Sequence, residues 1–104
     1  MVVTNGISVR YRVRRLRIEQ AWVRAILAAK QAVAAEPAVL EDPAALAAAV
    51  NKAAPQDCAS CKVEAARDGN TVVLTLAGTP GCGDDLKGHS LASKFTFSVA
   101  NYNR

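Results

Sequence analysis

The chain has 104 residues, of which 51% are hydrophobic and 21% are charged, and its formal net charge is +4. This length fits a single domain, and the composition is that of a folded globular protein rather than a disordered chain. The longest uncharged apolar runs, Ala25–Ala29 and Ala44–Val50, are far shorter than the ~20 residues that a membrane-spanning helix needs. The sequence therefore predicts one small domain with no membrane-spanning segment among these residues.

The positive charge is concentrated towards the N-terminal end. Residues 1–30 carry seven basic side chains and one acidic one, whereas residues 31–104 carry six basic and eight acidic ones. A charge asymmetry of this kind predicts a surface that meets an anionic group or a partner. The candidate binding residues are Arg10, Arg12, Arg14, Arg15 and Arg17.

The pattern of apolar residues in the first 14 positions fits both the period of a strand and the period of a helix. Apolar residues alternate with polar ones from Ile7 to Arg14, which is typical of a strand. Val9, Val13 and Leu16 also follow the i, i+4, i+7 spacing of a helix, and arginine is a good helix former. Residues 1–14 are therefore either a basic strand or an N-terminal extension of the next helix.

Residues 15–54 form the helical part of the predicted fold. A long helix is expected from about Leu16 to Glu36, ended by Pro37. Its apolar stripe consists of Ile18, Trp22, Ala25, Ile26, Ala29 and Val33, widened by Leu16, Val23 and Leu27. Trp22 on this stripe is interpreted as a core residue. A shorter helix is expected over 42–53, with Asp42 as its N-cap and Pro43 at its first position.

Residues 58–100 are predicted to form a β meander. Two strands, 61–67 and 71–77, flank a turn at Asp68-Gly69-Asn70. A loop is expected over 78–90 and a last strand over about 91–100. The predicted fold class is α+β, with a long N-terminal helix and a short helix packed on a three- to four-stranded antiparallel sheet.

The only cysteines, Cys58, Cys61 and Cys82, lie close in sequence to the only histidine, His89. If the turn is centred on Gly69, the hairpin brings Cys58 and Cys82 to its open mouth and Cys61 one step further in. The first interpretation is a Cys58–Cys82 disulfide, which would contribute about 3 kcal/mol in the chain-entropy model and indicate an oxidising compartment.

Three other interpretations of these residues stay open. The cysteines could be unlinked and structural. Cys58, Cys61, Cys82 and His89 could bind zinc, because Cys58-x2-Cys61 has the spacing of half a zinc knuckle, although the spacing from Cys82 to His89 is irregular. Redox chemistry at Cys58-x2-Cys61 would normally require a helix after the first cysteine, whereas a strand is expected here.

No catalytic motif is evident in this sequence. The glycines between 78 and 83 do not precede a predicted helix, as a phosphate-binding loop requires, and no acid–base or nucleophile–base pair can be assigned. Asp84 and Asp85 form an acidic pair in a glycine-rich loop, which is typical of a solvated surface. We therefore predict a protein that is not an enzyme and has no cofactor.

The arginines support one binding hypothesis directly. On a strand, Arg10, Arg12 and Arg14 would lie on one face about 6.6–7 Å apart, close to the repeat of phosphates along a nucleic-acid strand. The alternative function is therefore that of a small nucleic-acid-binding protein in the cytoplasm. A second possibility is a solvated basic edge strand that protects the sheet.

Several motifs resemble the type IV pilins. Tyr11-x3-Arg15, Gln20-Ala21 and the alanine-rich residues 28–36 are similar to the part of the pilin helix that follows its membrane half. Residues 68–76 (DGNTVVLTL) and 86–91 (LKGHSL) are similar to two pilin strands, and the order of helix, loop and meander is the same.

This resemblance implies an assembly function. A pilin-like or minor-pilin-like domain would be an exported structural subunit, periplasmic or extracellular, that self-assembles or binds protein partners through its helix. The apolar membrane half of the pilin helix and the usual C-terminal disulfide-bounded segment have no counterpart here. The resemblance therefore implies a subunit without its anchor, in which the arginines follow the membrane boundary.

Overall fold

The structure is a computed structural model, which describes residues 3–79, 81–86 and 92–99, with the side chains of 3–13 and of residue 85 left out. Its elements, in chain order, are the helices α1 (Val3–Ala35), η1 (Pro37–Glu41, 3-10) and α2 (Pro43–Ala53), the strands β1 (Lys62–Asp68) and β2 (Thr71–Ala77), the short 3-10 helix η2 (Gly83–Leu86) and the strand β3 (Lys94–Ser98).

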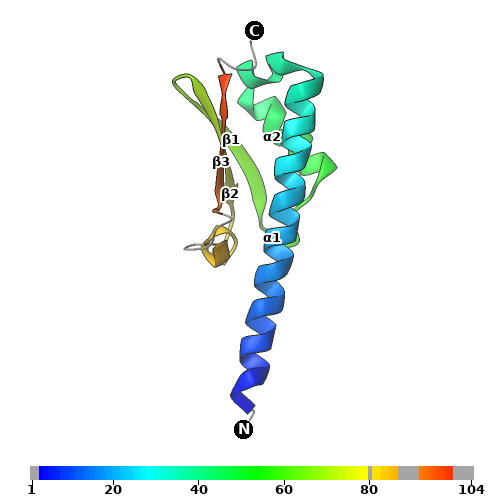
Figure 1. The fold of residues 1–104 in the computed structure, drawn as a ribbon, viewed down its shortest axis with the longest axis vertical. Coiled ribbons are helices and arrows are strands. Elements are labelled where there is room, and N and C mark those ends of the chain that lie inside the picture. The colour runs from blue at the N-terminus through cyan, green and yellow to red at the C-terminus, as the bar shows by residue number, and fades with distance from the viewer. Residues whose placement is uncertain (1–2, 80, 87–91, 100–104) are drawn as a thin grey trace.

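The helices cover one face of a three-stranded antiparallel sheet in the order β1-β2-β3 (Figure 1). The C-terminal half of α1 runs alongside the sheet, and its N-terminal half extends beyond it. A helix of 33 residues is about 50 Å long, which accounts for most of the 59 Å long dimension of the molecule. This arrangement confirms the predicted α+β fold class, with three strands.

The N-terminal segment is helical from Val3 onwards, so the strand interpretation of Ile7–Arg14 is wrong. Alternation and helical spacing overlap in this segment, and a pattern alone could not separate them. Extending an existing helix gains one hydrogen bond for each residue that is fixed. A strand would need a neighbouring strand to pair with, whereas the described sheet pairs β2 only with β1 and β3.

The predicted helix ends are close to those found. Glu36 separates α1 from η1, which begins at Pro37. α2 begins at Pro43 after its N-cap Asp42, whose carboxylate accepts a hydrogen bond of 3.3 Å from the Ala45 N–H. This bond satisfies one of the backbone donors that a helix N-terminus leaves unpaired. The N-cap prediction is thereby confirmed.

The core lies between the sheet and the helices. Alternate residues of β2, namely Val72, Leu74 and Leu76, are buried, as expected for a strand with one covered face. Trp22 of α1 is completely buried, and its Nε1–H donates a hydrogen bond of 2.7 Å to the Ala92 carbonyl. This bond joins the first helix to the chain just before the last strand, and it confirms Trp22 as a core residue.

Asn51 of α2 covers the outer edge of β1. Its Nδ2 donates to the Val63 carbonyl at 2.8 Å and to the Ala47 carbonyl at 2.9 Å, and its Oδ1 accepts the Val63 N–H at 2.8 Å. The amide thus pairs with Val63 as a neighbouring strand would. An unpaired edge strand is a site of unwanted association, and this contact blocks part of it.

Replacing Asn51 with alanine is expected to lower the free energy of unfolding by about 2 kcal/mol, because both backbone groups of the buried Val63 lose their partner. Asn51→Asp keeps the acceptor but loses the donor, so it should also destabilise the fold. The control is Lys52→Ala, an exposed position on the same helix, which should change stability by less than about 0.5 kcal/mol. Urea denaturation of the three variants measures their free energies of unfolding. Equal stability of Asn51→Ala and Lys52→Ala would contradict the stabilising role assigned to Asn51.

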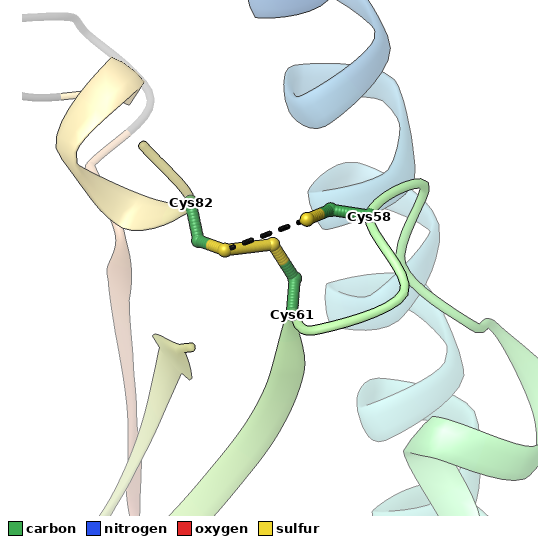
Figure 2. Close-up of side chains that lie close together, drawn as sticks. All are labelled: Cys58, Cys61 and Cys82. Atoms are coloured by element: carbon green, nitrogen blue, oxygen red, sulfur yellow. Dashed lines mark hydrogen bonds between the residues drawn. A yellow bond between two sulfur atoms is a disulfide. The ribbon is translucent and has the colours of Figure 1, made fainter. Parts of the chain in front are cut away.

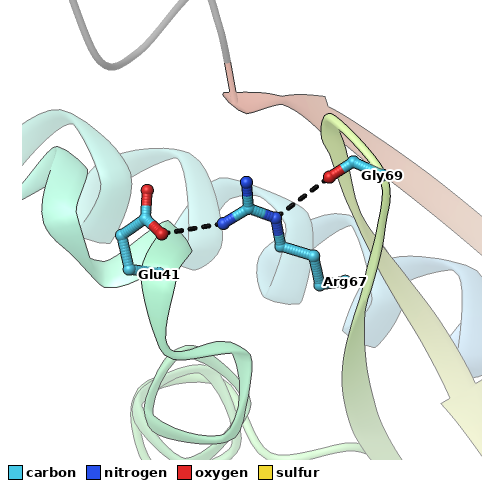
Figure 3. A network of polar contacts seen from close by, with 3 residues as sticks. All are labelled: Glu41, Arg67 and Gly69. Carbon is cyan, nitrogen blue, oxygen red and sulfur yellow. Dashed lines mark hydrogen bonds and ion pairs between the residues drawn. The ribbon is translucent and has the colours of Figure 1, made fainter.

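A surface ion pair connects η1 to the hairpin turn (Figure 3). Arg67 Nη1 lies 2.8 Å from Glu41 Oε2, and Arg67 Nε donates a hydrogen bond of 3.0 Å to the Gly69 carbonyl. Both side chains are substantially exposed, and ion pairs in such positions contribute about 0–1 kcal/mol. The contact orients the turn more than it stabilises the fold.

Candidate functional site

Three large apolar side chains of α1 are exposed. Leu16, Val23 and Leu27 have exposed fractions of 53%, 42% and 51%. The sequence predicted that they would widen the apolar stripe that contains Ile18 and Trp22. Ile18 and Trp22 are buried as predicted, but the widening is wrong, because these three side chains are exposed. Positions 16, 23 and 27 lie on the side of α1 turned away from the sheet, because each residue advances by 100° around a helix.

With Gln20, these residues follow a heptad pattern. The steps between Leu16, Gln20, Val23 and Leu27 are four, three and four residues, which is the spacing that keeps one seam of a helix facing a partner helix. We call these four residues the apolar row. In the sequence, Val13 and Val9 continue the same spacing towards the N-terminus; their side chains are outside the described ones.

The five candidate arginines do not form the row that a strand would give. In the helix, positions 10, 14 and 17 share one side by their i, i+4, i+7 spacing, and positions 12 and 15 fall elsewhere. The side chains of Arg10 and Arg12 are outside the described ones. Arg15 Nε lies 3.6 Å from Glu19 Oε1 in an i, i+4 ion pair, and Arg17 is exposed.

Arg14 differs from the other described arginines because it reaches the loop that carries Cys82. A Cβ atom placed on Gly81 would lie 2.5 Å from Arg14 Nη2. Gly81 therefore gives the guanidinium room against the backbone, and its φ of +102° is one that favours glycine. This contact brings a positive charge from α1 to the cysteine cluster, by which we mean Cys58, Cys61 and Cys82.

The cysteine cluster contains a disulfide between Cys61 and Cys82, with Cys58 as a free thiol (Figure 2). The predicted pairing of Cys58 with Cys82 is therefore wrong, while a disulfide involving Cys82 is present. The physical reason is that the strand pairing ends at Ala77, so the hairpin register does not determine where Cys82 lies. Asp68 pairs with Thr71 and Lys62 with Ala77, so the turn has two residues and Cys61 stands directly at the hairpin mouth.

Gly78 allows the chain to fold back onto Cys61. Its φ is +151°, and a Cβ there would lie 2.3 Å from the Ser60 carbonyl oxygen and 2.9 Å from Cys82 Sγ. After this approach a turn closes with the Cys82 N–H donating to the Thr79 carbonyl at 3.2 Å. Only glycine fits at this crossing without moving the backbone.

The free thiol stays close to the disulfide. Cys58 Sγ lies 3.9 Å from Cys82 Sγ (Figure 2), and the three sulfur atoms lie within 4.8 Å of one another. The Cys61 N–H donates to the Cys58 carbonyl at 2.9 Å, which closes a turn and holds Cys58 over the bond. Cys61 and Cys82 are buried, while Cys58 is half-buried.

Hydrogen bonds lower the pKa of the Cys58 thiol. The main cause is the Ser60 hydroxyl, 3.2 Å from Cys58 Sγ, followed by the Ser60 N–H; the Cys61 N–H and the charge of Arg14 act in the same direction, while burial opposes them. These donors favour the thiolate because they stabilise its negative charge. Ser60 is held in turn by the Thr79 hydroxyl at 2.7 Å.

The zinc hypothesis meets a chemical obstacle here. Zinc binds cysteine as a thiolate, and in this structure Cys61 and Cys82 are joined to each other. Among the residues that the structure describes, the cluster with metal-binding potential is that of the three cysteines, and His89 lies outside those residues. Asp84 is exposed, and the side chain of Asp85 lies outside the described ones.

Sequence reasoning found the cysteines but missed Ser60 and Thr79, since two hydroxyl residues 19 positions apart give no signal until the fold-back at Gly78 is known.

The described helices include none that is long and apolar enough to cross a membrane. In comparisons with known proteins, no protein family, no curated protein and no solved structure matches this chain.

Proposed function

We propose that this chain is a non-enzymatic assembly subunit, pilin-like in its plan, that associates with further copies of itself through the apolar row of α1. The observation that carries this proposal is the exposure of Leu16, Val23 and Leu27 along one side of a helix that extends beyond the sheet. Exposed leucines in a continuous helical row are typical of interaction surfaces.

A second copy is the partner that the pattern favours. In a parallel pair of helices the heptad positions of Gln20 and Val23 face their equivalents, and Glu19 and Arg24 then fall on the two flanking positions of the seam. Flanking positions of opposite charge form ion pairs between helices, so Glu19 of one copy and Arg24 of the other attract, whereas Arg12 and Arg17, at the flanking positions one heptad earlier, repel. The same residues line a shallow surface hollow of about 530 Å³.

Two further features support this plan. The helices and the meander follow the order expected for a pilin-like subunit. The Cys61–Cys82 disulfide fits an exported protein, because disulfides persist in oxidising compartments. Under this proposal, α1 is the stem of the subunit and the sheet with α2 is its head.

Replacing Leu16 and Leu27 together with glutamate is expected to weaken self-association by about tenfold or more, because two apolar contacts are lost and like charges face each other across the seam. Gln20→Leu should have the opposite effect, since it removes the polar residue from the seam. Ala44→Glu together with Ala49→Glu, two exposed positions on α2 that add the same two negative charges away from the apolar row, is the control.

Sedimentation equilibrium over a wide range of protein concentration measures these changes. A wild-type chain that stays monomeric at millimolar concentration, with Gln20→Leu monomeric too, would disprove the proposal. So would association that the double glutamate variant leaves unchanged.

The nucleic-acid alternative rested on a strand that would space Arg10, Arg12 and Arg14 along phosphates. Because α1 is helical over these positions, that specific geometry is lost and nothing else in the described residues favours this function. A titration of single-stranded DNA at low salt checks it, since contacts with phosphates strengthen as salt is removed. We expect no specific complex.

A further inference from the structure

We propose that the cysteine cluster is a thiol–disulfide exchange site, in which Cys58 attacks Cys82 Sγ and displaces Cys61. The observation that carries it is the position of the free Cys58 sulfur, 3.9 Å from a sulfur of the Cys61–Cys82 disulfide (Figure 2). Reacting atoms in productive ground-state geometries are about 3–3.5 Å apart, so the attack requires an approach of roughly half an ångström. It also requires a rotation of the Cys58 side chain into line with the Cys82–Cys61 bond, because all three sulfur atoms lie within 4.8 Å of one another.

The exchange needs no external oxidant or reductant. The Cys58 thiol gives its proton to water, and the thiolate forms a new bond to Cys82 Sγ while the bond between Cys82 and Cys61 breaks. The electron pair of the broken bond leaves with Cys61 as a thiolate, which then takes a proton from water. One disulfide and one thiol exist before and after the step, so the site interconverts two disulfide isomers.

The surroundings of the cluster suit this reaction. Thiolates, not thiols, attack disulfides, and the Ser60 hydroxyl, the N–H groups of the turn and the Arg14 charge all act on Cys58. The Thr79 hydroxyl bonds to Ser60 and lies 3.9 Å from Cys82 Sγ. The Ser60 and Thr79 hydroxyls therefore link the attacking sulfur to the attacked one, with the Ser60 hydroxyl on the side where the attacking thiolate forms.

The two isomers are similar in the chain that they enclose. The Cys61–Cys82 bond joins residues 21 positions apart, and a Cys58–Cys82 bond would join residues 24 apart. Because the entropy of loop closure varies slowly with loop length, neither isomer is strongly favoured by it. They differ in the thiol left over: the half-buried Cys58 in one and the buried Cys61 in the other.

The site also has access from solvent. A surface hollow of about 390 Å³ is lined by Gln56, Cys58 and Cys61 among others, and one of about 330 Å³ lies on the side of Cys82. Small thiol reagents can enter such openings. Cys58 is thus the position at which we expect modification by external thiols or alkylating agents.

The test is time-resolved alkylation of the unreduced, full-length chain with iodoacetamide, followed by an acid quench and peptide mapping by mass spectrometry. The expected result is a label mainly on Cys58, a smaller and pH-dependent label on Cys61, and a peptide pair linked through Cys58 and Cys82. Label confined to Cys58 at every time and pH, with a Cys61–Cys82 link alone, would overturn the proposal.

Two sets of variants sharpen this result. Cys61→Ser should form the Cys58–Cys82 disulfide and leave no free thiol, whereas two free thiols in the folded variant would count against the site. Ser60→Ala should slow exchange at neutral pH but not at alkaline pH, where the thiol is ionised in any case; Ser60→Thr, which keeps a hydroxyl, should restore the rate. Exchange through unfolding would not be slowed by Ser60→Ala, so an unchanged or faster rate would refute the mechanism.

Discussion

Replacing Trp22 with alanine is expected to lower the free energy of unfolding by about 3–5 kcal/mol, the usual cost of removing a large aromatic side chain from a core. Trp22 is completely buried against the sheet, and its Nε1–H donates to the Ala92 carbonyl. Domains of this size have total stabilities of about 5–15 kcal/mol. The variant should therefore be close to the limit of folding at room temperature.

Two further variants separate the contributions at this site. Trp22→Phe keeps an aromatic ring but loses the bond to Ala92, so it should cost about 1–2 kcal/mol. Leu27→Ala truncates an exposed apolar residue of the same helix and should change the stability of the monomer by less than about 0.5 kcal/mol. Thermal and urea unfolding of the three variants measure this order, and a Leu27 effect as large as that of Trp22 would contradict the assigned core.

Removing the sulfur of Cys82 is expected to cost about 3 kcal/mol of stability. The Cys61–Cys82 bond joins residues 21 positions apart, and closing a loop of that length lowers the entropy of the unfolded chain by this amount in the chain-entropy model. Cys82→Ala abolishes both bonds that this sulfur can form. Denaturant unfolding without reductant is the measurement.

The other two cysteines supply the comparison. Cys58→Ala leaves the disulfide intact and should have an effect below about 1 kcal/mol. Cys61→Ala should cost less than Cys82→Ala, because Cys58 lies close enough to Cys82 to replace its partner. Equal losses in Cys61→Ala and Cys82→Ala would mean that no second disulfide forms in the folded protein.

The fold class and most element boundaries could be predicted because local signals mark them. Asp42 and Pro43 define a helix start, Pro37 ends the helix before it, and Asp68-Gly69-Asn70 defines the hairpin. Each of these signals acts through the backbone conformation of a few neighbouring residues. Such local signals depend little on the rest of the fold, so the ends of these elements could be predicted from the sequence.

The cysteine pairing could not be predicted, because it depends on where the strand pairing ends and the chain folds back. If the ladder continued, a turn centred on Gly69 and the two-residue turn found here would both place Cys82 opposite a residue near Cys58. The ladder ends at Ala77 instead, with Cys61 at the hairpin mouth. The fold-back at Gly78 then selects Cys61. The pairing of the strands and the close approach of segments that are far apart in the sequence are fixed together by the three-dimensional fold. The amino-acid composition does not reveal them.

The exposed side of α1 illustrates a second limit. Leu16, Val23 and Leu27 have the same apolar character as the buried residues beside them, so hydrophobic spacing assigned all of them to one broad stripe. In the structure the part of the stripe that contains Trp22 is buried, and Trp22 is bonded to Ala92. The sequence showed that α1 is apolar around much of its circumference, and the fold shows which side is left for a partner.

The bond from Trp22 to Ala92 also has a consequence for biosynthesis. It joins residues 70 positions apart, and Phe97 and Val99 complete the core beside it. Since a chain emerges from the ribosome N-terminal end first, α1 is made long before the strand that closes its apolar face. The nascent helix therefore has Trp22 uncovered until residues 92–99 have left the ribosome, and the core of the domain cannot close before then.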